Sequence, residues 1–204
     1  MRIAVAGCGP LAAQVLDRML RPDRQVTEVY APSPQDTLWQ AAVHYGLPIH
    51  TSECLGAVSP TLGGWDLRPC DLLVCAGHRD RLPGSLIRQP TEGTIGYHPS
   101  LLPLHRGRDA IKWAIANGDR VTGGTVYQLT EDLDRGPIYE QGHVFIRPDD
   151  TPGRLWERVL LPMGVKLLDR AVDRVHAGVK PFPQPRVPGS WEPAFPRDKE
   201  VATA

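Results

Sequence analysis

Residues 93–103 read Gly-Thr-Ile-Gly-Tyr-His-Pro-Ser-Leu-Leu-Pro, a short apolar strand that runs into a loop at His98. Because Pro99 has a fixed φ, it restricts the backbone of His98 to extended angles and holds the imidazole where the chain leaves the sheet. Further along, Asp134 lies on a loop that ends in Gly136 and Pro137. A histidine and a carboxylate at loop ends are typical of a site that moves protons.

Strands and helices alternate around this stretch. The apolar spacing predicts strands at residues 2–7, 26–31, 47–50, 71–77 and 93–97, and helices at residues 11–20 and 35–45. Residues 71–77 are apolar after the first, as expected for a strand covered on both faces. The pattern predicts an α/β fold, Rossmann-like, with a mostly parallel twisted sheet and helices on both faces. Ligands of such sheets bind beyond the carboxyl ends of the strands, which makes residues 77–83 and 98–103 the expected cleft walls.

The second half of the chain continues with a helix and two strands. We expect these at residues 108–116, 122–129 and 137–145. A long helix should begin around residues 150–152, bend at Pro162 and end at Gly178. Prolines then recur, so no regular element is expected. We therefore predict a catalytic domain over residues 1–180 and a proline-rich tail over residues 181–204 that wraps the surface.

The composition excludes some partners. The chain has 204 residues with 23 basic and 23 acidic side chains, so it has no overall field that attracts nucleic acid or an anionic membrane. No apolar run approaches the roughly 20 residues that cross a bilayer. The four cysteines show no close CxxC spacing, and Met1 leads into a strand rather than a signal segment. We expect a cytoplasmic protein with no membrane partner and no metal.

Residues 7–12 read Gly-Cys-Gly-Pro-Leu-Ala, a variant of the dinucleotide-binding fingerprint. The acidic residue that would bind the ribose is missing after the second strand, where the chain reads Tyr30-Ala-Pro-Ser33, and Pro10 alters the turn. We therefore favour a tight turn that starts a helix over a nicotinamide site. The turn could still hold the phosphate of an acceptor.

The sequence HPSLLP at residues 98–103, the following Arg106-Gly107, TGGTV at residues 122–126 and LDRGPI at residues 133–138 together resemble a known family. They are similar to the 10-formyltetrahydrofolate-dependent formyltransferases and to the hydrolase domain of formyltetrahydrofolate dehydrogenase. The resemblance is strongest over residues 71–141. It implies the formyltransferase fold, 10-formyltetrahydrofolate as formyl donor, and an Asn-x-His plus Asp catalytic set in which His98 and Asp134 fill two places.

Gly96 stands where the family has asparagine. Residues two apart on a strand share a face, so Gly96 and His98 should face one cleft, without the amide donor. Removing one such donor typically slows a reaction on the order of 100-fold. Transfer to an amine remains the leading function. Hydrolysis of 10-formyltetrahydrofolate, with Asp134 activating water, and a non-catalytic folate- or nucleotide-binding module are the alternatives.

The resemblance also implies the binding residues. The folate would lie between two cleft walls that comprise Arg79, Asp80, Arg81, Leu82, Leu129, Thr130, Glu131 and Leu133. Substrate contacts are assigned to Ser100, Leu101, Leu102, Pro103 and Arg106. Leu101, Leu102 and Pro103 would support the ring system of the folate. The Arg106 guanidinium suits an acceptor phosphate or the glutamate tail of the folate.

Two acceptor classes of the resembling enzymes fit this sequence poorly. Formyltransferases that act on initiator methionyl-tRNA carry an additional C-terminal domain, so we expect no tRNA partner. The glycinamide ribonucleotide subfamily has Gly-x-Gly-Ser-Asn in its phosphate loop, where this chain has Pro10 and Leu11 in place of Ser-Asn. A small-molecule amine is the expected acceptor, for example a nucleotide-linked amino sugar. The sequence leaves open whether two copies of the protein form a homodimer.

Overall fold

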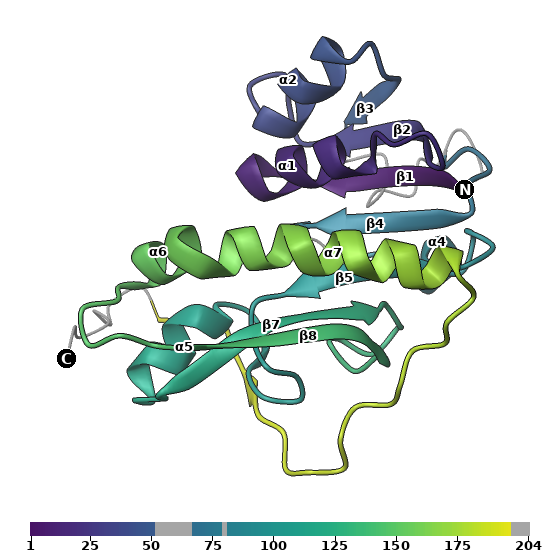
Figure 1. Cartoon of the computed structure of the whole chain (residues 1–204). Helices are drawn as coiled ribbons and strands as arrows, with labels where there is room; N and C mark the ends of the chain where they lie inside the picture. The colour runs from purple at the N-terminus through teal and green to yellow at the C-terminus, as the bar shows by residue number, and fades with distance from the viewer. Residues whose placement is uncertain (52–66, 79–80, 197–204) are drawn as a thin grey trace.

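The computed structural model describes residues 1–51, 67–78 and 81–196. A seven-stranded sheet in the order β3-β2-β1-β4-β5-β7-β8 forms the centre of the molecule (Figure 1). Its strands are β1 (Arg2–Gly7), β2 (Gln25–Ala31), β3 (Ile49–Thr51), β4 (Leu72–Ala76), β5 (Thr94–His98), β7 (Val121–Gln128) and β8 (Ile138–Phe145). The pairs from β3 through β5 are parallel, whereas β7 pairs antiparallel with both β5 and β8. The predicted Rossmann-like α/β fold is confirmed.

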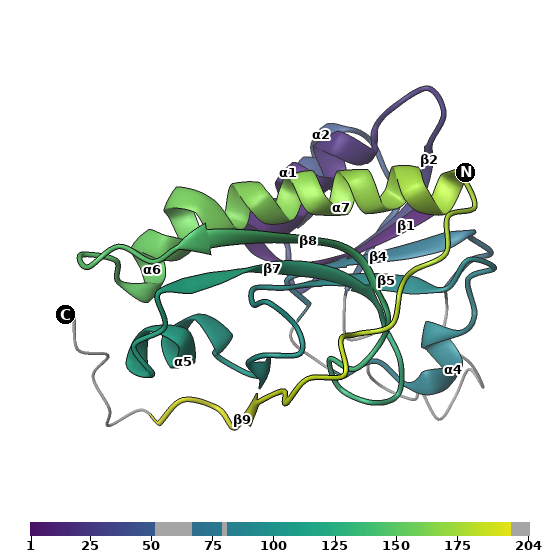
Figure 2. The same ribbon diagram turned by 60° about the horizontal axis from the view of Figure 1, so that its bottom comes forward.

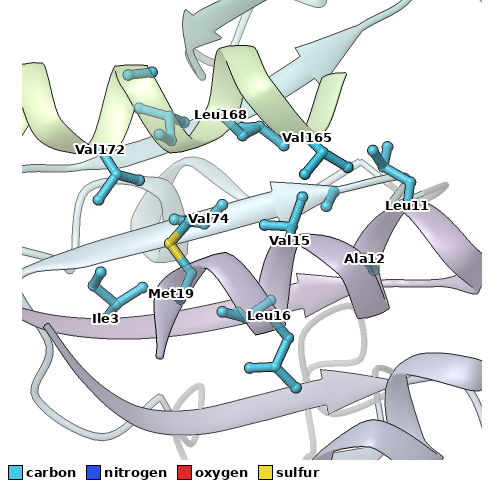
Figure 3. Packing of buried hydrophobic residues seen from close by; sticks show 14 of the residues in the cluster. Ile3, Leu11, Ala12, Val15, Leu16, Met19, Val74, Val165, Leu168 and Val172 are labelled. Carbon is cyan, nitrogen blue, oxygen red and sulfur yellow. The ribbon is translucent and has the colours of Figure 1, made fainter. Parts of the chain in front are cut away.

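Helices cover both faces of this sheet, as Figure 2 shows. They are α1 (Gly9–Met19), α2 (Thr37–His44), α4 (Gly84–Ile87), α5 (Ala110–Ala116), α6 (Pro152–Leu155) and α7 (Leu161–His176). On one face α1 packs beside α7, where Val15 and Met19 meet Leu168 and Val172 above Val74 (Figure 3). All five side chains are buried. Burial of this apolar seam is the main force that holds the helices on the sheet.

The other face of the same strands forms a second apolar cluster. Ala4, Leu73 and Cys75 point to this side and share the cluster with Leu86 and Ile87 of α4. Successive residues of a strand point to opposite faces, which explains why the unbroken apolar run of β4 fills two cores. The carboxyl ends of β4 and β5 are thereby fixed from above and below.

The long C-terminal helix begins close to its predicted start. The side chain of Thr151 caps α6 by accepting a hydrogen bond of 3.2 Å from the Arg154 N–H. The irregularity lies just before the predicted bend, as a π-helical segment over Trp156–Leu160 that leads into Pro162 at the start of α7. Proline has no N–H to donate, so the chain widens into this turn rather than continuing regularly. Among the described helices, none is long and apolar enough to span a bilayer.

The expectation that the tail has no regular element is wrong. Residues Trp191–Glu192 form β9, which pairs in parallel with β6 (Arg106–Gly107) in the loop after β5. Gly107 has a φ of +96°, and a Cβ there would lie 2.5 Å from the carbonyl oxygen of Glu192. Glycine is required because the two backbones approach so closely. The tail therefore crosses beneath the sheet and contacts the loop that follows β5 (Figure 2).

Candidate active site

A cleft of about 930 Å³ opens at the carboxyl ends of β4 and β5, where the fold predicts a ligand. Its walls come from the loop after β4, the end of β5, the start of α5 and the loop between β7 and β8. Six of the predicted folate residues line it: Arg81, Leu82, Leu129, Thr130, Glu131 and Leu133. The other two, Arg79 and Asp80, lie outside the described residues.

His98 is the last residue of β5 and is 8% exposed. Its Nε2 lies 2.6 Å from the backbone oxygen of His105. A carbonyl oxygen can only accept a hydrogen bond, so Nε2 carries the hydrogen. The opposite nitrogen, Nδ1, lies 3.8 Å from Oδ2 of Asp134. The imidazole therefore faces the carboxylate with its Nδ1.

Asp134 is held in the left-handed region, with a φ of +53°, and is 6% exposed. Its Oδ1 accepts a hydrogen bond of 2.6 Å from the hydroxyl of Tyr127, and its Oδ2 accepts one of 2.7 Å from the Gly107 N–H. Burial, followed by the charge and hydrogen bond of Asp134, raises the pKa of Tyr127 well above its usual value. The phenol therefore stays protonated at neutral pH and continues to donate.

Gly96 lines the cleft together with His98, as their spacing predicts. The side chain of the intervening Tyr97 points to the opposite face, where its hydroxyl donates a hydrogen bond of 2.8 Å to the oxygen of Leu160. A Cβ built on Gly96 would lie 2.6 Å from Cδ1 of Leu129. The Leu129 side chain therefore occupies the space beside Gly96 into which a side chain at this position would extend.

The five predicted substrate residues lie behind the cleft rather than among the residues that line it. The Ser100 hydroxyl donates to the oxygen of Leu104, and Leu102 packs against Tyr127 and Ile138. Arg106 donates from Nε to the backbone oxygen of Asp134 over 3.2 Å. These residues shape the loops that carry His98 and Asp134, so a direct contact with substrate is not supported for them.

The glycine-rich turn after β1 starts α1, as its sequence favours, and a carboxylate of the protein lies against it. The Gly9 N–H donates to both carboxylate oxygens of Asp36, over 3.0 and 3.2 Å. Asp36 also caps α2 through the Leu38 N–H at 2.8 Å. A side chain of the protein thus takes the position at the start of α1 where a phosphate would bind. Neither the dinucleotide nor the acceptor-phosphate interpretation of this turn is supported.

Four residues that position this site were missed by sequence reasoning. His105 supplies the carbonyl that fixes His98, and Tyr127, Gly107 and Gln184 contact Asp134. Tyr127 could have been found, because it lies opposite Gly96 in the register of β5 and β7. Gln184 lies among prolines and gives no such signal. In the part of the chain that the structure describes, no three His, Cys, Asp or Glu side chains are grouped to hold a metal.

Three proteins illustrate what the chain is similar to. It is 40% identical over 112 residues to the mitochondrial 10-formyltetrahydrofolate dehydrogenase of Mus musculus, which covers 54% of this chain and 12% of that protein. It is 36% identical over 191 residues to the methionyl-tRNA formyltransferase of Acidothermus cellulolyticus, covering 93% and 58%. The structure of an N-formyltransferase from Helicobacter canadensis, in complex with folinic acid and dTDP-3-aminofucose, has a TM-score of 0.72 at 19% identity and covers 94% and 70%.

These likenesses differ in what they establish. The chain spans less than two thirds of both curated relatives, and the structural likeness shows a shared fold. The family model for formyl transferase matches residues 65–172, which is more than half of the chain and includes both His98 and Asp134. The chain therefore belongs to the formyl transferase family.

Proposed function

We propose that this protein transfers a formyl group from 10-formyltetrahydrofolate to the amine of a small-molecule acceptor. The observation that carries the proposal is the pair of His98 and Asp134, which face each other across 3.8 Å in the wall of a cleft of about 930 Å³. This separation is longer than a hydrogen bond, so a reacting atom can approach both groups. The family of the chain supports the same reaction.

The folate ring would lie between the two apolar walls of the cleft. Leu82 and Ile87 belong to one wall and Leu129 to the other, and volumes of this order are typical of small-molecule sites. Cys75 also lines the cleft, but burial raises the pKa of its thiol to about 12. The thiol stays neutral at physiological pH, so it is a poor nucleophile and serves as part of the floor.

The reaction needs one donor for the formyl oxygen and one base for the amine. The amine nitrogen attacks the formyl carbon, and the carbonyl electron pair moves to oxygen. His98, with a second proton on Nδ1, donates to that oxygen, while Asp134 accepts a proton from the new C–N nitrogen. The carbonyl then re-forms, the bond from carbon to N10 of the folate breaks, and N10 takes the proton from Asp134. The products are the formamide and tetrahydrofolate.

A nucleotide-linked amino sugar is the acceptor class that we favour. The support is the solved formyltransferase of the same fold that holds dTDP-3-aminofucose. Asp36 fills the turn after β1, so the diphosphate of such an acceptor must bind elsewhere, at a cationic side chain. Arg108 lines the cleft and its side chain is exposed. It is the candidate for that contact.

Hydrolysis of 10-formyltetrahydrofolate is a second candidate, favoured by Gly96. The position that carries an amide in the resembling transferases has no side chain here and is bordered by Leu129. A stretch of 112 residues of this chain is 40% identical to a 10-formyltetrahydrofolate dehydrogenase. With water as nucleophile, Asp134 would accept its proton, and the products would be formate and tetrahydrofolate.

One assay separates these functions. The protein is incubated with 10-formyltetrahydrofolate, with and without a panel of amines that includes nucleotide-linked amino sugars, and the release of tetrahydrofolate is followed. Release that requires an amine, with a matching formamide in the mass spectrum, supports transfer. Release of formate without amine supports hydrolysis. Folate binding with no turnover would overturn both and support a non-catalytic binding module.

A further inference from the structure

We propose that Gln184, in the proline-rich tail, is a positioning residue for Asp134; its catalytic consequence rests on the proposed function. The Gln184 Nε2 donates hydrogen bonds to the backbone oxygens of Asp134 and Gly136, over 2.8 and 2.9 Å. Its Oε1 accepts one of 2.6 Å from Arg106. Both hydrogens of the amide and its oxygen are therefore engaged by the two loops that carry the site.

These contacts act on a residue that needs support. Asp134 adopts a φ of +53°, which is unfavourable for a residue with a side chain. Its backbone oxygen receives hydrogen bonds from both Gln184 and Arg106. Fixing this peptide fixes the direction of the side chain, which places one oxygen at the Tyr127 hydroxyl and the other between Gly107 and His98.

The tail also holds the other half of the catalytic pair. Ser190 accepts a hydrogen bond of 2.7 Å at its Oγ from the His105 N–H. His105 has a φ of +52° and presents the carbonyl that accepts from Nε2 of His98. Its Nδ1 lies 3.1 Å from Glu192. The segment from Gln184 to Glu192 thus helps to hold the Asp134 carboxylate and the His98 imidazole in position, although none of its residues lines the cleft.

The first experiment replaces Gln184 with glutamate. Gln184→Glu keeps the shape of the side chain but turns the Nε2 donor into an oxygen that faces two carbonyls. We expect kcat to fall about 10- to 100-fold and KM to change less than about threefold, because a misplaced base affects the reacting geometry more than binding. Gln89→Glu is the matched control: the Gln89 amide donates over 2.8 Å to the oxygen of Leu67, and Gln89 is exposed. It should leave kcat unchanged.

A double-mutant cycle separates positioning from general support. If Gln184 acts through Asp134, then Gln184→Glu should change kcat less than about twofold in an Asp134→Asn background. The same fold-loss in both backgrounds would overturn the proposal. So would a loss of kcat in Gln184→Glu that disappears on assay 15 °C lower, because that result indicates partial unfolding.

A spectroscopic measurement keeps the inference independent of turnover. The carboxyl carbon of Asp134 is observed by ¹³C NMR in the free protein, assigned through Asp134→Asn. We expect its chemical shift to move in Gln184→Glu and to stay in place in Gln89→Glu. An unmoved signal overturns the positioning role. A moved signal in a protein that turns over no formyl donor would instead overturn the proposed function alone.

Discussion

Strands β1 and β5 end at the same edge of the sheet, but the loops that follow them differ. One is closed by a side chain of the protein, and the other opens onto a cleft. After β1 the chain makes a glycine-rich turn whose Gly9 N–H is taken by the carboxylate of Asp36. After β5 it presents His98, which lies beside Asp134 in the wall of an open cleft. The carboxyl end of a strand is thus only a place where a site can form. It becomes a site where the polar groups line an open cavity that no neighbouring side chain fills.

The largest expected effect breaks the site after β5. His98→Ala removes the proposed donor to the formyl oxygen, and we expect turnover of 10-formyltetrahydrofolate to fall about 100- to 10,000-fold. Initial rates with saturating donor check this. His143→Ala, at an exposed histidine on β8, is the control and should keep its rate. Activity that survives in His98→Ala would remove the basis of the mechanism.

The next test fills the space beside His98. Gly96→Asn places a Cβ 2.6 Å from Leu129, so we expect a lower melting temperature and slower turnover. Leu129→Ala should relieve this contact. If the missing amide limits the rate, Gly96→Asn combined with Leu129→Ala should turn over faster than Leu129→Ala alone, by up to about 100-fold. Equal rates in these two variants would show that the amide is not limiting.

A third change opens the turn after β1. Asp36→Ala removes the cap of α2 and the carboxylate at Gly9, and we expect the free energy of unfolding to fall by about 1–2 kcal/mol. Urea unfolding measures this. Turnover should be unchanged, because the turn does not line the cleft. A fall in kcat larger than the change in folded fraction would show that the two strand ends are coupled.

The smallest effect depends on pH. The folded-state pKa of Tyr127 is raised above its ordinary value of 10, by burial first and then by Asp134. Its bond to the carboxylate therefore stabilises the fold below pH 10, and this stability is lost as pH rises through the higher folded-state pKa. Tyr127→Phe should cost about 1 kcal/mol at pH 8. In urea titrations the difference from wild type should shrink above pH 10; a difference that grows there would contradict this sign.

Local patterns predicted most of the sheet and the central pair. Apolar runs such as residues 71–77 identify β4, and the proline after His98 fixes a strand exit, so both could be found without tertiary information. The features that were not predicted depend on distant partners. Asp36 fills the turn at Gly9 from the next helix start, and β9 exists only because β6 lies beside it. A two-residue strand among prolines has no periodicity to detect.

The position of Gln184 has a consequence for how the protein is made. It follows Asp134 by 50 residues, yet its amide holds that loop. At about 5–20 residues per second, a ribosome adds Gln184 about 3 to 10 seconds after Asp134. The sheet can form during that interval, but the carboxylate acquires its final orientation only when the tail emerges. A nascent chain should therefore bind its ligands late, after almost everything else has folded.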